Sequence, residues 1–396
     1  METYKFRDKV FLEKCNNAGE VFNFIDKTLD NYELPKNKNA RIVLKPNLNN
    51  DMNALIGNST DLRVIVGVIK ALQKREYKDI TIADGPNCGI DHMNIDVFKR
   101  LKIDKIAEMF NVKLVNLNKS DYNIVDLETG KAKTGKIILE NDFLINLPKV
   151  KTHIEVGMTI CMKNFVGCYQ ALDKRNIHDS LVENIVRMNE IKKPDLNIVD
   201  GLIAMEGNGP AAGIPKKLNF VLVGENSFIT DLLCMKLFGF DLNYVPYLKL
   251  SIEKGHIKKE DLDYLESIKE ITKLKRAKEN IFVKIFLNNF FVRLRYNRFI
   301  DPLFKKGPVP GFFTLLGVRQ DVYDFKDDNI TRLYLENGSK SEKCEEFCPL
   351  ELSNPSDQKC INCLYCFMID KNIKHEGELG FLKGQLKRYD KYLKKL

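Results

Sequence analysis

Five of the ten cysteines of this chain lie in one short segment, between Cys344 and Cys366. Three of them follow the spacing C-x2-C-x2-C, which is typical of three ligands of an iron–sulfur cube whose fourth ligand comes from elsewhere in the chain. In bacterial ferredoxins that fourth ligand is a cysteine followed by proline, and Cys348 precedes Pro349. The sequence therefore predicts one 4Fe-4S cluster, with the ligands Cys348, Cys360, Cys363 and Cys366.

The same ferredoxin pattern has four ligand positions for a second cluster, and three of them hold other residues. These three are Gly338, Ser341 and Asp370, and the remaining one is Cys344. We interpret the segment as a two-cluster module reduced to one cluster, with Cys344 as a leftover thiol or a group beside the cluster. A zinc site is the first alternative, although zinc prefers two separated C-x2–4-C pairs. Disulfides are the second, and they are rare in the cytoplasm.

A second set of chemically active side chains lies in the first 250 residues, at the ends of predicted strands. Its lysines and an asparagine could surround a phosphate, a carboxylate or another anion. The residues of this expected anion pocket are Lys45, Lys149, Lys151 and Asn164. The alternative is that the lysines are solvated and the neighbouring glycines serve turns.

Three further residues are candidates for catalysis, namely His153, His178 and Lys163. Either histidine could act as a general base or bind a metal, although a lone histidine is often structural. Asp200 and Glu206 could supply a pair of carboxylates, or Asp200 could cap a turn before Gly201. The glycine-rich stretch 207–213 matches neither common nucleotide-binding pattern.

Several strings in this region resemble the family called domain of unknown function 362. They are the KPN turn at 45–47, PKVKTH at 148–153, MKNFVG at 162–167, the pair His178-Asp179, VDG at 199–201, MEGNGPAAG at 205–213 and TDLLCMKLFGF at 230–240. Many members of that family carry a ferredoxin-type module at the C-terminus. The resemblance implies an iron–sulfur protein from a bacterium living with little or no oxygen, and it brings no established reaction.

The elements that must position these residues alternate along the chain. Strand-like runs at 40–48, 79–85, 136–149, 196–201 and 218–224 are separated by helical patterns such as 17–30 and 60–75. This alternation predicts an α/β fold with a mostly parallel sheet flanked by helices, in which ligands bind at the carboxyl ends of the strands. We expect an α/β domain over 1–254, a linker with an amphipathic segment over 255–319, and a ferredoxin-like α+β module over 320–396.

The positive charge of the chain is concentrated outside the expected α/β domain. The formal net charge is +9, and the segments 284–306 and 371–396 each carry five more basic than acidic residues. Residues 281–304 are also rich in phenylalanine, so this segment could lie on an anionic membrane or dock on the large domain. Because no nucleic-acid motif accompanies the charge, we expect an acidic partner surface or a membrane rather than nucleic acid.

The sequence as a whole favours a redox protein. It shows neither a signal peptide nor a transmembrane run, so we expect a cytoplasmic protein, with peripheral contact at the inner face of the membrane through 281–304. The leading hypothesis is that one 4Fe-4S cluster relays electrons between a redox partner protein and a small anionic ligand or other substrate of the α/β domain. The alternative is a non-redox enzyme or anion-binding module with a structural or sensing cluster.

Overall fold

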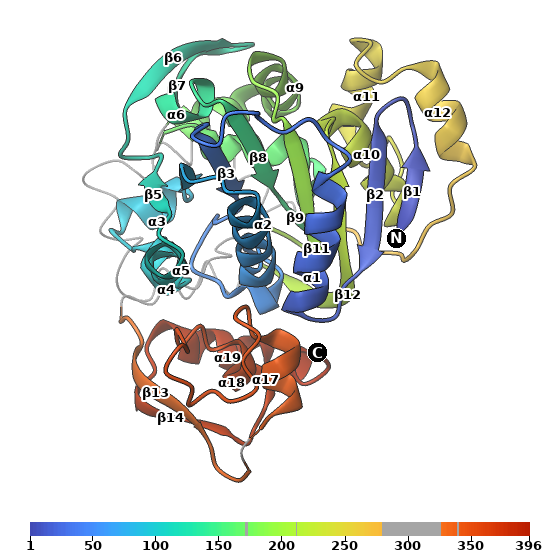
Figure 1. Ribbon diagram of the computed structural model, residues 1–396. Coiled ribbons are helices and arrows are strands. Elements are labelled where there is room, and N and C mark those ends of the chain that lie inside the picture. The colour runs from blue at the N-terminus through green and yellow to red at the C-terminus, as the bar shows by residue number, and fades with distance from the viewer. Residues whose placement is uncertain (171–172, 211, 279–325, 339) are drawn as a thin grey trace.

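The computed structural model describes residues 1–170, 173–210, 212–278, 326–338 and 340–396. Within them the chain forms a large α/β body, which ends at residue 278, and a smaller lobe that begins at residue 326 (Figure 1). The basic, phenylalanine-rich segment 281–304 lies outside the described residues.

The body is built on one large sheet with the strand order β1-β2-β12-β11-β8-β3-β4-β5. Its central strands run parallel, as the alternating pattern predicts. These strands are β3 (Ile42–Pro46), β4 (Ile80–Asp84), β5 (Lys113–Asn116), β8 (Phe143–Leu147) and β11 (Leu196–Asn208). The expectation of an α/β fold with a mostly parallel sheet is therefore confirmed.

Antiparallel strands extend the sheet on one side. They are β1 (Glu2–Lys5), β2 (Lys9–Lys14) and β12 (Ala212–Gly224). A hairpin of β9 (Lys149–His153) and β10 (Gly157–Thr159) pairs with β11 beyond the end of β8. A separate hairpin of β6 (Tyr122–Leu127) and β7 (Gly130–Gly135) lies outside the main sheet.

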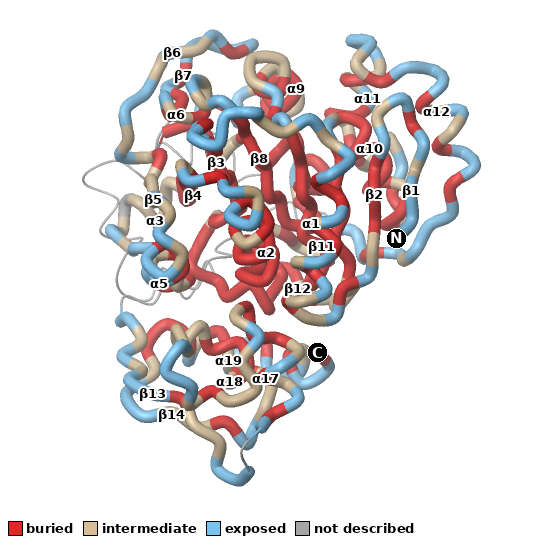
Figure 2. Tube along the Cα trace, viewed as in Figure 1, coloured by how far each residue is buried: buried red, intermediate tan, exposed pale blue. Residues whose placement is uncertain are grey.

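Helices cover both faces of the sheet. One face packs against α1 (Ala18–Leu29) and α2 (Leu62–Lys74), and the other packs against α9 (Leu181–Ile191) and α10 (Ser227–Leu237). The strands show why, because Ile42 and Leu44 of β3 join the first core whereas Val43 between them joins the second. The alternation of side chains along each strand thus supplies two apolar faces, and Figure 2 shows that strands β3, β4 and β8 consist of buried residues.

Local sequence sets where these helices begin. The side chain of Asn17 accepts a hydrogen bond from the N–H of Glu20 at the start of α1, and Asp61 accepts one from Arg63 at the start of α2. Both residues are favoured N-caps because they satisfy backbone donors that have no partner inside the helix. The remaining helical segments of the body are η1 (Ala54–Ile56), α3 (Cys88–His92), α4 (Val97–Arg100), α5 (Ile103–Met109), α6 (Lys136–Leu139), α7 (Cys161–Asn164), η2 (Phe165–Cys168), α8 (Asp173–Asn176), η3 (Ile177–Ser180), α11 (Pro246–Glu253) and α12 (Lys259–Glu266).

Two regions differ from the sequence expectations. The run 136–149 begins with the short helix α6 and continues as β8 and the first residue of β9, instead of being strand throughout. Residues 255–278, expected as part of a linker, pack on the body: Leu265, Ile268 and Leu274 belong to the same core as α10. This charged stretch has too few apolar positions for its sequence pattern to distinguish a linker helix from a segment that packs on the body.

The C-terminal lobe contains the small antiparallel sheet of β13 (Asn329–Leu335) and β14 (Ile373–Glu378), with α17 (Glu342–Phe347), α18 (Tyr365–Ile369) and α19 (Phe381–Leu393). It shares its apolar core with the α1–α2 face of the body. Polar contacts add to this packing, because Gln385 of α19 accepts a hydrogen bond from the backbone N–H of Asn53 and donates one to the carbonyl of Asp51. The amphipathic tail helix expected from the sequence is α19, with Leu382, Tyr389 and Leu393 on its buried side.

Candidate functional site

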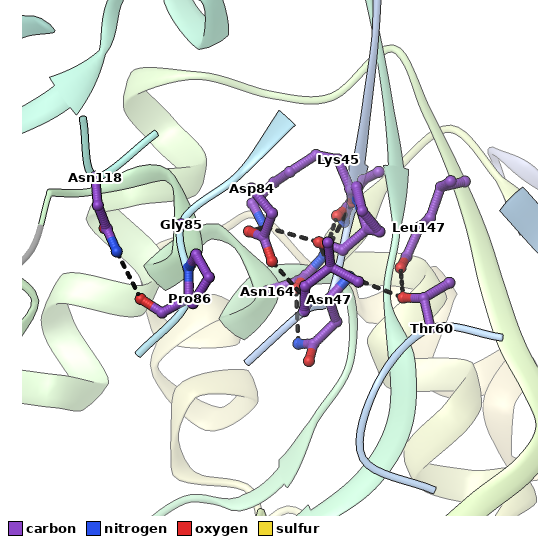
Figure 3. Close-up of polar contacts among 12 residues, drawn as sticks. Lys45, Asn47, Thr60, Asp84, Gly85, Pro86, Asn118, Leu147 and Asn164 are labelled. Carbon is purple, nitrogen blue, oxygen red and sulfur yellow. Dashed lines mark hydrogen bonds and ion pairs between the residues drawn. The ribbon is translucent and has the colours of Figure 1, made fainter. Parts of the chain in front are cut away.

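The strand order reverses between β3 and β8. The chain runs from β3 through β4 to β5 on one side of this point, and later from β8 to β11 on the other. In open parallel sheets, the carboxyl ends of the strands at such a switch point form the usual ligand site. Here that edge holds a dense polar network (Figure 3). The network begins with Lys45 at the end of β3, Asp84 at the end of β4 and Asn146 at the end of β8.

Lys45 and Asp84 form a buried ion pair across β3 and β4. The Nζ atom of Lys45 is 2.7 Å from Oδ1 of Asp84, and both side chains are almost fully buried. The second carboxylate oxygen of Asp84 accepts a hydrogen bond from the N–H of Leu48 at 2.6 Å. Gly167 lies directly against this pair, because a Cβ atom at that position would be 2.5 Å from Oδ1 of Asp84. The glycine of the MKNFVG string therefore makes room for the ion pair.

Asparagine side chains connect the strands at the switch point. Asn164 of α7 donates a hydrogen bond to Oδ1 of Asn146 and accepts one from Asn47, each at 2.8 Å. Thr60 links the same region, because its hydroxyl donates to the carbonyl of Leu147 and accepts from the N–H of Asn47. Asn164, which we expected to contact an anion, thus belongs to a buried hydrogen-bond network that holds α7 against β3 and β8.

A second buried ion cluster joins β9, β11 and the start of α2. Lys149 is 2.9 Å from Oδ2 of Asp200, and that same oxygen accepts the backbone N–H of Asp61 at 2.6 Å. The carboxylate of Asp61 pairs with Arg63 at 2.8 Å. Burial raises the pKa of Asp200, whereas Arg63 and Lys149 outweigh burial and hold the pKa of Asp61 below its ordinary value. We call Lys149, Asp200, Asp61 and Arg63 the buried quartet.

Lys151 and Lys163 have no carboxylate within ion-pair distance among the described residues. Lys151 donates hydrogen bonds to Oδ1 of Asn47 at 2.8 Å and to the carbonyl of Asn58 at 2.9 Å. Burial, reinforced by the charges of Lys163, Lys149 and Lys45, lowers its pKa well below the usual value. Lys163 is 8% exposed, and burial lowers its pKa to about 8 although Glu155 opposes the shift.

The two candidate histidines meet at Glu155, in the turn between β9 and β10. The ring atom Nδ1 of His178 is 3.3 Å from Oε1 of Glu155, and Nε2 of His153 is 4.0 Å from Oε2. The backbone N–H of Glu155 donates to Nδ1 of His153 at 3.1 Å, so a neutral His153 carries its proton on Nε2. Burial and then the charge of Lys163 lower the pKa of His153 well below 6.5, whereas the charges around Glu155 lower its pKa to about 2 despite burial.

The two carboxylates suggested by the sequence lie in different environments. Asp200 belongs to the buried quartet and also accepts the N–H of Leu202 at 3.0 Å, as a turn-capping residue would. Glu206 pairs instead with Lys216 at 3.7 Å and with Lys275 at 3.4 Å. The sequence reasoning missed the carboxylates of Asp84 and Glu155 as members of the site. Asp84 could have been identified from the sequence, since it lies at the end of a predicted strand.

The cysteines of the C-terminal lobe come together from two segments and are all free thiols. Cys344 is within hydrogen-bonding reach of both Cys348 and Cys366. The contact with Cys348 lowers its pKa, but the contact with Cys366 and burial outweigh it and raise the pKa to about 12. Burial and then the charge of Cys348 raise the pKa of Cys363, and the same two causes contribute to raising that of Cys360. The described residues contain no group of three or more His, Cys, Asp or Glu side chains that is arranged to hold a metal ion.

Two of the three positions left without cysteine by the ferredoxin pattern also lie together. The hydroxyl of Ser341 donates to Oδ2 of Asp370 at 2.6 Å and accepts the N–H of Cys344 at 3.1 Å. Ser341 and Asp370 are distant in sequence, yet the pattern assigns both to the same second cluster. A short hydrogen bond thus joins two positions that would be ligands in a two-cluster module.

The cysteine-bearing loop contacts the body next to the buried quartet. The carbonyl of Cys363 accepts a hydrogen bond from the side chain of Asn53 at 3.3 Å, and the hydroxyl of Tyr365 accepts the N–H of Leu62 at 3.1 Å. Arg63 of the quartet donates to the carbonyl of Glu346 at 3.2 Å, and its guanidinium lies 5.0 Å from the ring centre of Phe347. The start of α2 therefore connects the cysteine loop to Lys149 and Asp200.

The chain was compared with known protein families, curated proteins and solved structures, and the family match lies within the body of the molecule. Residues 42–236 match the family model described as Domain of unknown function (DUF362), in agreement with the resemblance of the motifs. A curated relative, the thylakoid-associated protein sll1697 of Synechocystis sp. (strain ATCC 27184 / PCC 6803 / Kazusa), is 26% identical over 219 residues, which cover 52% of this chain and 65% of that protein. The chain therefore spans less than two thirds of the length of this relative.

A solved structure with some similarity is the lactate racemase apoprotein from Thermoanaerobacterium thermosaccharolyticum. The TM-score is 0.31 at 9% identity, and the match covers 54% of each chain. A search of the described helices finds none that is long and apolar enough to cross a membrane.

Proposed function

We propose that this chain is an iron–sulfur redox protein that binds one 4Fe-4S cluster through Cys348, Cys360, Cys363 and Cys366. The observation that carries the proposal is the cysteine spacing together with the Ser341–Asp370 hydrogen bond at 2.6 Å. Ligand spacing of this kind is specific to ferredoxin-type sites, and the two substituted positions adjoin as the two-cluster pattern requires. When bound, the cluster supplies one-electron transfer.

The chain around the four thiolates is suited to this task. Burial raises the pKa of Cys363, and for an ordinary thiol this would oppose ionisation, whereas a bound metal holds a thiolate deprotonated. The lobe buries Cys348 and Cys366 and leaves Cys360 and Cys363 partly accessible. One-electron exchange with an acidic partner protein is supported by the exposed basic residues Lys383, Lys387 and Lys391 on α19 and by Lys395, which follows the helix.

The substrate side of the proposed relay is the switch-point site. The contacts from Cys363 through Asn53 and from Glu346 through Arg63 lead to the buried quartet. Beyond the quartet, burial and the charge of Lys163 favour the neutral ring of His153, which is the form that can act as a general base. Lys163 is suited to hold or deliver a proton because its pKa is about 8. We therefore propose a reaction in which electron transfer at the lobe accompanies proton transfer at His153 or Lys163, with His178 positioned through Glu155.

Iron analysis tests the cluster assignment directly. After anaerobic reconstitution we expect about four iron atoms per chain, a broad absorption band in the visible range, and a paramagnetic signal after reduction with dithionite. Fewer than about three iron atoms per chain, or bound zinc in their place, would contradict the proposal.

A second candidate function is a non-redox enzyme or an anion-binding module in which the cluster is structural or senses oxygen. The observation that favours it is the packing between the lobe and the body. At this contact Gln385 makes two hydrogen bonds with the backbone of residues 51–53. The two functions differ in one measurement. A cluster that raises the unfolding temperature but does not change its paramagnetic signal with dithionite supports the second candidate.

We also propose peripheral contact with a membrane through residues 281–304, which lie outside the described residues. The composition of this segment supports the proposal, and so does the similarity to a relative that is named as thylakoid-associated. We expect the full chain to co-sediment with vesicles containing about 30% anionic lipid and to be released as salt screens the charges. Replacing Arg293, Arg295 and Arg298 together by glutamine should abolish this binding. Binding to neutral vesicles at the same level would exclude electrostatic docking.

A further inference from the structure

The switch-point site contains more buried lysine side chains than carboxylates that pair with them. Of the four lysines that gather there, Lys45 and Lys149 pair with Asp84 and Asp200. The other two, Lys151 and Lys163, lie close enough for the charge of Lys163 to lower the pKa of Lys151. Lys151 is bonded only to neutral oxygens, and for Lys163 the described residues provide neither a hydrogen bond nor an ion pair. A buried charge ordinarily has a partner of opposite sign.

Two buried oxygen atoms beside Lys151 also have no hydrogen-bond partner among the described residues. They are Oγ1 of Thr159 and Oδ1 of Asn58. Thr159 is directly opposite Lys151 in the β9–β10 hairpin, so the two side chains emerge on the same face. Asn58 accepts the Lys151 ammonium with its backbone carbonyl and donates its side-chain amide to the carbonyl of Pro210. Both side chains are more than nine-tenths buried, and such groups in native proteins are nearly always satisfied.

We infer that Lys163, Lys151 and Thr159 bind an oxyanion of the substrate, a phosphate or a carboxylate, at the carboxyl end of the sheet. The inference deepens the proposed function, since it names the substrate class of the same site. Lys163 supplies positive charge, and the charge of the anion favours the ammonium form of Lys151 over its neutral amine. The hydroxyl of Thr159 donates a hydrogen bond to an anion oxygen. Asn58 Oδ1 accepts a hydrogen bond from a hydroxyl of the same ligand, such as the one on hydrogen phosphate or on a hydroxycarboxylate.

The surrounding groups favour an anion over a cation. Among the described residues, the carboxylate whose charge acts on Lys163 is that of Glu155, and both His153 and His178 already share it. Lys45 and Lys149, which we expected from the sequence to bind the anion, keep their own carboxylates. We therefore place the anion beside Lys151 and Lys163 rather than beside Lys45 and Lys149. In this position it lies next to the neutral ring of His153.

Titration calorimetry on the full chain, under anaerobic conditions, tests the inference with two probes. Inorganic phosphate and glycolate represent the two sources of an oxyanion with a hydroxyl, and acetate lacks the hydroxyl. We expect phosphate or glycolate to bind, and acetate to bind more weakly. Lys163→Gln should weaken binding by at least about tenfold, because a charged hydrogen bond is lost. Lys163→Arg should retain most of it.

The exposed Lys131 provides the matched control, because Lys131→Gln removes one lysine that pairs only with the exposed Asp126 among the described residues. It should bind as the unmodified chain does. Binding should also fall as the pH rises above about 8, since the pKa of about 8 makes Lys163 neutral there. A chain that binds neither probe, or a correctly folded Lys163→Gln variant with unchanged affinity, would overturn the inference.

Measuring the iron content of each sample distinguishes failure of the oxyanion site from failure of the redox proposal. Anion binding can be measured in Cys363→Ser, which retains every residue of the switch-point site. Anion binding that persists in a chain unable to hold iron supports the oxyanion site alone. A normal cluster in a chain that binds neither probe leaves the redox proposal standing and removes the oxyanion site.

Discussion

Cys348→Ser is expected to reduce the iron content of the reconstituted chain from about four atoms to about one or none, whereas Cys344→Ser should leave it unchanged. The two cysteines are both buried, and Cys348 follows Cys344 by one helical turn. The ferredoxin pattern assigns only Cys348 to the surviving cluster, because it precedes proline. The two variants therefore allow a proposed ligand to be compared with a neighbouring cysteine of similar burial.

Iron analysis and the reduced paramagnetic spectrum of both variants are the measurements. Cys344 is close to Cys348 and Cys366, so its loss should alter the shape of the spectrum without removing it. The assignment of ligands would be wrong if Cys344→Ser lost the cluster and Cys348→Ser kept it. Equal loss in both variants would show that packing of the segment, rather than direct coordination, limits assembly.

Lys149→Met is expected to lower the free energy of unfolding by about 3–5 kcal/mol. The change leaves Asp200 as a buried carboxylate that keeps the N–H groups of Asp61 and Leu202 but loses its charged partner. Its pKa, already raised by burial, should rise further. Protonation is then favoured in the folded state, so the variant should lose less stability at acidic pH than at neutral pH.

Urea unfolding at pH 7 and pH 5 measures this effect, with iron bound to the same extent in all samples. The control is Lys131→Met, whose partner Asp126 is 3.8 Å away on the surface and 75% exposed. Surface ion pairs contribute about 0–1 kcal/mol, so this control should be nearly as stable as the unmodified chain. A loss in Lys149→Met no larger than in the control would mean that Asp200 is solvated in the folded protein.

The order of strands and helices could be predicted in large part from the sequence. Buried parallel strands such as β3 and β8 are apolar runs interrupted only by Lys45 and Asn146, and helices α1 and α2 combine an N-cap with an amphipathic stripe. The N-terminal hairpin of β1 and β2 was not predicted, because the residues of β1 are largely exposed and lack an apolar signal. Its strand conformation depends on pairing with β12, which is more than two hundred residues away in the sequence.

The site residues were predicted as a group, but their partners were not. Lys45, Lys149, Lys151, Lys163 and His153 all belong to the switch-point region. Their spacing along the chain, however, contains no information about which lysine meets a carboxylate. Asp84 and Asp200 reach their lysines only through the pairing of neighbouring strands, so the division into neutralised and surplus lysines appears only in three dimensions.

The sequence by itself determined the α/β class, the cysteine ligand set that we propose and the clustering of polar residues at strand ends, because these depend on local spacing and periodicity. Tertiary structure decided the strand order, and with it the switch point between β3 and β8. It also decided that Ser341 meets Asp370, that the cysteine loop rests on the start of α2, and that Lys163 is left without a partner among the described residues. Each of these depends on contacts between segments far apart in the chain, where burial removes water and makes every unpaired charge costly.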